Sequence, residues 1–169
     1  MGRLGEHLYQ QFGGDVPATP QEVARAAIGQ YGSGRAAGRA LGVDEKTIRR
    51  WKNGETVRSG NVERIARDTR ATKADAHTGP IGVRFKQGNR DRTLTFGNGA
   101  GGQRGLKPGA ADRVKDAYVA GDKDRMAAEF AMGVDDAWYR MAFLRGLEAE
   151  EAGRGVDLAD SPPTPVFVI

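Results

Sequence analysis

A short basic segment carries the residues best able to bind a polyanion. Its charged and polar side chains fall on one side of a predicted helix: Lys46, Thr47, Arg49, Arg50 and Asn53. Ile48 and Trp51, three residues apart, fall on the opposite side. An apolar back and a basic front let a helix pack on a protein core while it contacts phosphates and base edges in the DNA major groove. The alternative is an ordinary helical hairpin with a solvated charged face.

The preceding residues predict the turn that presents this helix. Residues 34–41 form a first helix with a small, apolar face, and Gly42 stands where a tight turn requires positive φ. Val43 then packs between the two helices, and Asp44 is placed to cap the second one. The segment therefore predicts a helix-turn-helix.

Composition is consistent with a nucleic-acid partner. The chain has 169 residues, a formal net charge of +4 and a pI of about 9.6. A basic balance favours DNA, RNA or anionic membranes as partners. Because no stretch is apolar enough to span a bilayer, we expect no membrane partner and a cytoplasmic, nucleoid-associated location. The chain contains no cysteine, which excludes disulfides and thiolate metal sites.

The distribution of patterns predicts an α+β protein with two domains. Residues 1–75 form an N-terminal helical domain that contains the helix-turn-helix. Residues 76–169 form a C-terminal domain with a basic β-hairpin, helices and an apolar tail. In the first domain, Thr19 and Pro20 mark the start of a supporting helix, with a capping box completed by Glu22. That helix is expected to bury Val23, Ala26, Ala27 and Tyr31. Asn61 is expected to cap a further helix over residues 62–70.

Alternating apolar residues predict the β-hairpin. Residues 81–85 and 93–96 alternate with period two, and residues 88–91 between them indicate a loop longer than a two-residue turn. The hairpin carries the basic residues Arg84, Lys86, Arg90 and Arg92. A basic ribbon could contact a phosphate backbone, or it could be a solvated sheet face. The glycine-rich residues 97–109 do not match a phosphate-binding loop and are expected to form a flexible loop.

The C-terminal part is predicted to be helical over residues 110–120, 124–132 and 135–151. The apolar residues of the last helix are expected to lie in the core: Trp138, Met141, Ala142, Leu144 and Leu147. The final residues 166–169 are too apolar to remain in water, so they are expected to add a strand to a sheet or dock on a partner. Residues 127–136 also echo residues 36–45, either as a second helix-turn-helix shape used in packing or by chance.

No arrangement of residues indicates an enzyme. The chain has two histidines, His7 and His77, and both lie in segments expected to be terminal or mobile. A general acid–base site requires titratable groups held together in a cleft. Adjacent acids such as Asp135 and Asp136 point away from one another on a helix and serve better as a cap. We therefore expect no catalytic residues, no metal site and no cofactor.

Several segments together resemble a known family. The start MGRLGEHL, the segment GSGRAAGRALGVDEKTIRRWKNGE, the strands GPIGVRF and RDRTLTF, and the apolar end VFVI are similar to the telomere terminal proteins of linear actinomycete replicons, the Tpg type. The resemblance covers most of the chain. Its specific parts are the helix-turn-helix and RDRTLTF.

The resemblance implies a protein that caps linear DNA ends and primes DNA synthesis there. In that family a side-chain hydroxyl accepts the first nucleotide and becomes covalently linked to the DNA 5′ end. The implied partners are a DNA polymerase and an accessory telomere-binding protein. By position, Thr95 is the first candidate acceptor and Thr93 the second.

The alternative function is a transcriptional or plasmid-replication regulator without covalent DNA attachment. A regulator of this kind reads a palindromic operator as a homo-oligomer, usually a dimer. The basic hairpin has no role in that alternative, which favours the terminal protein.

Overall fold

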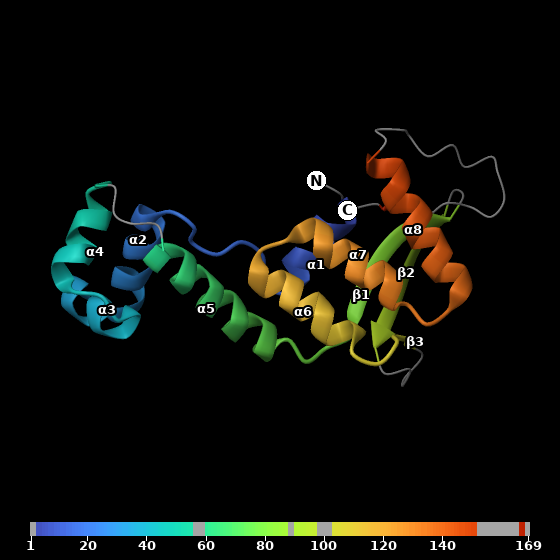
Figure 1. The fold of residues 1–169 in the computed structure, drawn as a ribbon, viewed down its shortest axis with the longest axis horizontal. Coiled ribbons are helices and arrows are strands. Elements are labelled where there is room, and N and C mark those ends of the chain that lie inside the picture. The colour runs from blue at the N-terminus through green and yellow to red at the C-terminus, as the bar shows by residue number, and fades with distance from the viewer. Residues whose placement is uncertain (1–2, 56–59, 88–89, 98–102, 152–165, 168–169) are drawn as a thin grey trace. The chain divides into compact units, whose positions relative to one another are not determined.

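The computed structural model describes residues 3–55, 60–87, 90–97, 103–151 and 166–167, and shows a mixed α+β chain that is mostly helical (Figure 1). The chain divides into two compact units. Residues 15–72 form the first, here called the helical unit. Residues 1–14 and 73–169 form the second, here called the mixed unit.

The helical unit consists of short helices around a small core. They are α2 (Pro20–Tyr31), α3 (Gly34–Leu41), α4 (Glu45–Lys52) and the first part of α5 (Gly60–Ala76). α2 packs against both α3 and α4. The buried core residues come from all four helices: Val23, Ala24, Ala27, Ala37, Ile48, Trp51, Val62 and Ile65.

The predicted start of α2 is confirmed. The Thr19 hydroxyl accepts the Glu22 N–H at 3.2 Å, and the Glu22 carboxylate accepts the Thr19 N–H at 3.1 Å. Pro20 occupies the first turn, where its missing N–H costs nothing. These backbone bonds from Thr19 and Ala18 lower the pKa of the Glu22 carboxyl. The capping box therefore sets where α2 begins.

Two expectations in this unit are wrong. Val23 and Ala27 of α2 are buried, but Ala26 and Tyr31 are exposed. The apolar residues of α2 form a wider stripe than the part of the helix that the core covers. Asn61 does not cap α5, since the helix already includes Gly60 and continues to Ala76.

The mixed unit places helices against a small sheet. Its elements are α1 (Arg3–Gln11), β1 (Ile81–Gln87), β2 (Arg90–Gly97), β3 (Arg104–Gly105), α6 (Ala110–Ala120), α7 (Lys123–Gly133), α8 (Ala137–Glu151) and β4 (Val166–Phe167). β1 and β2 pair antiparallel, so the predicted hairpin is confirmed. The expected longer loop is wrong, because the pairing continues to Gln87 and Arg90. The strands lie in the order β3-β2-β1-β4.

Of the two short strands, β4 was predicted as one possibility and β3 was not predicted. β4 pairs antiparallel with β1, so residues 166–167 of the apolar tail do add a strand. β3 pairs parallel with β2 inside the segment expected to be a loop. There, the Leu106 N–H donates to the Gly97 carbonyl oxygen and the Asp135 N–H donates to the Gly105 carbonyl oxygen, so the described residues 103–109 are tied to β2 and to the start of α8.

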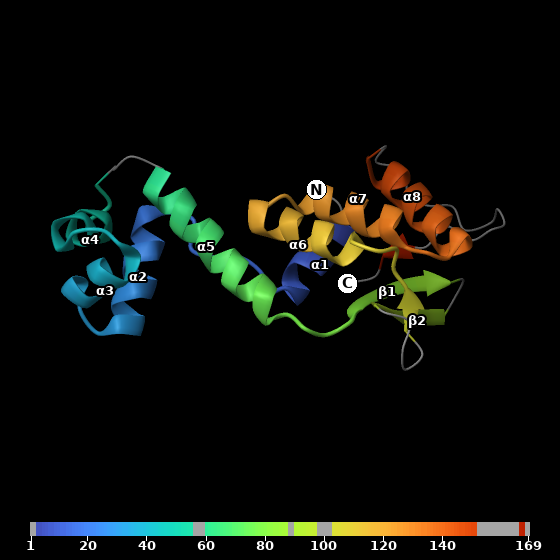
Figure 2. The ribbon, with the colours of Figure 1, turned by 60° about the horizontal axis from the view of Figure 1, so that its bottom comes forward.

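Helices α7 and α8 lie over one face of the hairpin, and α6 packs against α7 (Figure 2). Ile81, Val83 and Phe96 face them and are buried. The Phe96 ring contacts Phe130 and Phe143 edge-on, with centroids 5.1 and 5.6 Å away. Aromatic pairs prefer such edge-to-face geometry. This cluster holds α7 and α8 on the hairpin.

α1 belongs to the mixed unit, whereas the sequence placed residues 1–75 in one N-terminal domain. Leu4 and Leu8 are fully buried in the mixed-unit core. Lys123 Nζ lies 2.7 Å from the Glu6 carboxylate and 4.6 Å from the Tyr9 ring centre. A methyl group on Gly5 would overlap the Lys123 carbonyl oxygen. Lys123 lies more than a hundred positions from these residues, and local patterns do not reveal a contact over such a distance.

The predicted apolar face of α8 is wrong in part: Ala142 is buried and Leu144 and Leu147 pack against the core, but two other residues do not. Trp138 and Met141 are 41% and 49% exposed, whereas the buried residues among those described in α8 are Ala142, Phe143 and Gly146. The helix is apolar on several sides, so periodicity alone did not identify the side that packs.

The sequence similarity between residues 36–45 and residues 127–136 does not extend to backbone geometry. Gly42 adopts positive φ in a turn, whereas Gly133 lies inside α7 and its missing side chain leaves room for Ala110. The acid pair does supply a helix cap, as expected: the Asp136 carboxylate accepts the Trp138 N–H at 2.9 Å, at the start of α8.

Candidate nucleic-acid interface

The turn between α3 and α4 has the predicted geometry. Gly42 has φ 66° and ψ 33°, the left-handed region that glycine adopts without strain. The Val43 N–H donates to the Gly38 carbonyl oxygen at 2.9 Å, which closes the turn tightly. The Asp44 carboxylate accepts the Thr47 N–H at 2.6 Å and caps α4. This bond lowers the pKa of Asp44, so the cap is ionised at neutral pH.

α4 has two chemically distinct sides. Ile48 and Trp51 are fully buried. The polar side carries four exposed residues and one half-buried residue: Lys46, Arg49, Arg50 and Asn53 are exposed, and Thr47 is half-buried. Asn53 lies at the C-terminal cap and not within the helix. The predicted apolar back and basic front are therefore present on one eight-residue helix.

The two arginines on this side differ in their surroundings. Arg50 Nε donates to the Glu55 carboxylate at 2.8 Å, with both side chains about half exposed. Arg49 forms no ion pair with any residue that the structure describes. An anionic ligand would meet a positive charge directly at Arg49, whereas at Arg50 it would compete with Glu55.

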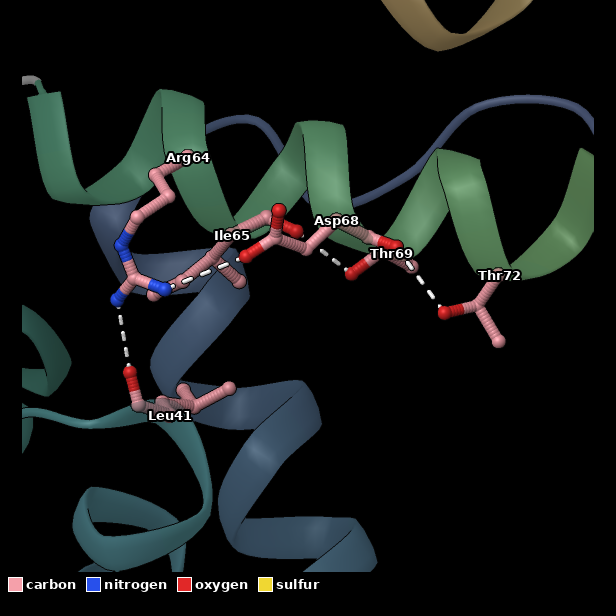
Figure 3. A network of polar contacts seen from close by, with 6 residues as sticks. All are labelled: Leu41, Arg64, Ile65, Asp68, Thr69 and Thr72. Carbon is pink, nitrogen blue, oxygen red and sulfur yellow. Dashed lines mark hydrogen bonds and ion pairs between the residues drawn. The ribbon is translucent and has the colours of Figure 1, made fainter.

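Two side chains hold the ends of α3 and α4 in place, and their roles were not predicted. The Gln21 amide donates to the Lys52 carbonyl oxygen at 3.4 Å and so links α2 to the end of α4. Arg64 donates to the Leu41 carbonyl oxygen at 2.9 Å and to Asp68 at 3.2 Å, which links α5 to the end of α3 (Figure 3). A helix leaves its last carbonyl groups unpaired, and a side chain from another helix can satisfy them.

The hairpin residues belong to the mixed unit, so the predicted DNA-binding residues are divided between the two units. Thr93 pairs with Arg84, and Thr95 pairs with Gly82. These positions alternate with the core positions Val83 and Phe96, so they face away from the core. Thr93 and Arg84 are exposed, and Thr95 is half-buried. The side chains of Lys86, Arg90 and Arg92 lie outside the described part of the chain.

Both histidines contact other parts of the mixed unit, and His7 lies in the N-terminal helix α1. His7 Nε2 lies 3.0 Å from the Gly82 carbonyl oxygen. His77 packs on Phe12 with ring centroids 4.3 Å apart, and its buried Nε2 has no hydrogen-bond partner. Burial, followed by the nearby positive charge of Lys115, lowers the pKa of His77.

The described residues contain no cluster of three or more His, Asp or Glu side chains that could hold a metal ion. No helix in the same part of the chain is long and apolar enough to cross a membrane. Comparisons with protein-family models, with curated proteins and with solved structures found no match to this chain.

Proposed function

We propose that this protein binds duplex DNA through α4, with α3, the Gly42 turn and α4 acting as a helix-turn-helix. The observation that carries the proposal is the exposed basic side of α4, held opposite two fully buried residues on the same short helix. A helix presented in this way fits the major groove. The helix dipole by itself favours basic residues in the last turn of any helix. It does not account for Lys46, which lies in the first turn of α4.

The proposal is tested by fluorescence anisotropy with DNA selected by this protein from a random-sequence duplex pool. We expect Arg49→Ala to weaken binding by about 1–3 kcal/mol if the guanidinium contacts a base. Arg50→Ala should also weaken binding, but by less, because Glu55 already pairs with Arg50. Arg25→Ala in α2 is the charge-matched control, since Arg25 is exposed and lies outside α4.

Binding should also weaken as the salt concentration rises, because phosphate contacts release counterions. Unchanged affinity in both α4 variants, together with salt-insensitive binding, would contradict the assignment of α4 to DNA.

Among DNA-binding roles, we propose the terminal protein, which caps linear DNA ends and primes end-filling. Two observations support this role. The chain resembles that family in α4 and in the hairpin, and Thr93 presents a hydroxyl on the exposed side of the hairpin beside Arg84. A regulator that reads an operator leaves this hairpin without a role.

In this role the threonine oxygen attacks the α-phosphorus of a deoxynucleoside triphosphate bound by a polymerase. The new oxygen–phosphorus bond replaces the bond to pyrophosphate, which leaves, and the hydroxyl proton passes to a base or water in the polymerase site. The polymerase supplies the metal ions. The protein contributes the hydroxyl and nearby positive charge, and Thr95 and Thr93 remain the two candidate acceptors.

Mass spectrometry distinguishes the two roles. The protein is recovered together with its native DNA, and nuclease then digests the DNA exhaustively. The remaining protein is analysed intact and, after proteolysis, as peptides. The terminal-protein role predicts a residual nucleotide on the peptide that contains Thr93 and Thr95, lost in the Thr93→Val, Thr95→Val double variant. Unmodified protein that salt alone releases from DNA would instead support the regulator.

A further inference from the structure

A groove in the helical unit lies beside the turn that presents α4. Its walls come from α2, the last turn of α3 and the middle of α5, and it contains no residue of α4. It consists of an apolar and a polar pocket that share Tyr31, Leu41, Ile65 and Thr69. We call it the α2–α5 groove.

The apolar pocket has room for one ring or branched chain. Val23, Ala27 and Ile65 are buried residues on its wall, and Tyr31 is 42% exposed at its edge. Its volume is about 140 Å³. A cavity of about 150 Å³ lined by apolar residues can hold a benzene ring. Tyr31 continues the apolar stripe of α2 past the core, so an occupant would cover a surface that the unit itself leaves open.

The adjoining polar pocket is larger, at about 460 Å³, and carries an uncompensated positive charge. Arg64 on its wall is neutralised by Asp68 and held by the Leu41 carbonyl (Figure 3). Thr69 and Thr72 donate their hydroxyl protons to backbone carbonyls of α5, so their oxygens remain available only as acceptors. Arg39 is exposed and has no ion pair with a described residue.

We propose that the α2–α5 groove binds a small amphiphilic anion. Its apolar ring or branched chain occupies the pocket beside Tyr31, and its carboxylate lies at Arg39. The site is separate from the DNA-binding surface of α4, so both can be occupied together. Gly42 also lines the polar pocket, which places an occupant against the turn that positions α4. The groove therefore suits an effector of the DNA-binding unit.

The test uses phenylacetate as the probe and the full chain without DNA, so its result does not depend on the DNA-binding proposal. Two-dimensional ¹H–¹⁵N NMR follows the backbone amides during titration. We expect saturable shifts confined to residues around the groove, including Tyr31, Leu41 and Thr69. Phenylacetamide, which has the same ring without the charge, should bind about tenfold more weakly.

Three variants test the two ends of the groove. Arg39→Gln should weaken phenylacetate binding about tenfold and leave phenylacetamide binding unchanged. Ala26→Phe should abolish both, because a ring at this exposed lining position fills the apolar pocket. Arg35→Gln is the matched control, since it removes an exposed α3 charge that does not line the groove and should leave both affinities unchanged. Far-UV circular dichroism verifies that each variant is folded.

Several outcomes would overturn the proposal. They are shifts that do not saturate, shifts centred outside the groove, equal binding of the charged and neutral probes, or an Arg39→Gln variant that binds phenylacetate like the parent. A concentration-dependent dimer in sedimentation, with the groove amides protected in the dimer, would assign the groove to a second copy of the chain.

Discussion

At the scale of single residues, the geometry of the α3–α4 turn depends on Gly38, which has no Cβ atom. A Cβ atom at Gly38 would lie 2.8 Å from the Val43 carbonyl oxygen and 3.3 Å from the backbone of Asp44 and Glu45. The atoms it would meet belong to the main chain, which cannot rotate aside as a long side chain can. Gly38 thus sets how closely α3 approaches the start of α4.

Gly38→Ala should therefore destabilise the helical unit by about 1–3 kcal/mol, as expected for overpacking. Urea unfolding measures this, with Trp51 fluorescence as the reporter in a Trp138→Phe background. The control is Gly29→Ala in α2, where an added Cβ meets nothing within 4 Å. That variant should gain about 0.5–1 kcal/mol, because alanine favours a helix more than glycine does. Equal effects at the two glycines would contradict the close-approach argument.

His77 makes the stability of the mixed unit sensitive to mild acid. Burial and then Lys115 lower its pKa below the ordinary value of 6.5. Between the ordinary value and the lowered one, the unfolded chain binds a proton that the folded chain does not. The free energy of unfolding should therefore be highest above about pH 6.5 and fall as the pH drops through that window.

NMR titration of the His77 ring gives its folded pKa directly, and denaturation at pH 7.5 and 5.5 gives the stability difference. His77→Phe retains a ring next to Phe12 and removes the titrating group, so it should reduce that difference. A His77 midpoint at or above 6.5 would show that its folded environment does not disfavour the charged form.

At the scale of elements, α1 acts as a partner for the edge of β1. The Gln11 side-chain oxygen accepts the Gly82 N–H at 2.9 Å, and the Gln11 amide and His7 both reach the Gly82 carbonyl oxygen. Further along β1, the backbone of β4 pairs with residues 85 and 86. An unpaired strand edge is a site for unwanted pairing with other chains. α1 and β4 therefore each cover a different part of the same edge.

Gln11→Ala should expose the Gly82 amide and accelerate its hydrogen exchange by about tenfold or more. Gln10→Ala is the control, because the Gln10 amide donates only within α1, to Glu6 at 2.9 Å. Exchange at Gly82 that is equally slow in both variants would mean that the Gln11 bond does not protect this edge.

At the scale of the whole molecule, the two units have separate cores. The core of the helical unit contains only residues between Val23 and Ile65. The core of the mixed unit is built from α1, Ala74, the hairpin and the C-terminal helices. α5 is continuous across the boundary at residues 72–73. Because no core residue is shared, each unit is expected to retain its packing without the other.

A fragment of residues 15–76 should therefore fold and keep Trp51 buried, which intrinsic fluorescence reports as a blue-shifted emission maximum. If α4 supplies the DNA contacts, the fragment should also bind selected duplex DNA with an affinity close to that of the full chain. A folded fragment with much weaker binding would show that the mixed unit contributes to DNA affinity. An unfolded fragment would show that the two units are not independent.

The sequence by itself determined the features that depend on near neighbours. The Thr19 and Asp44 caps, the Gly42 turn, the two sides of α4 and the hairpin could all be predicted, because each is decided by residues a few positions apart. The side chains of α4 could be assigned to its polar side for the same reason.

Only the tertiary structure decided which surfaces meet. It placed α1 in the mixed unit, used Arg64 to hold the end of α3, and left Tyr31 and Trp138 exposed. Each of these depends on residues distant in the chain. Periodicity shows which side of a helix is apolar, but what covers that side depends on how the whole chain packs.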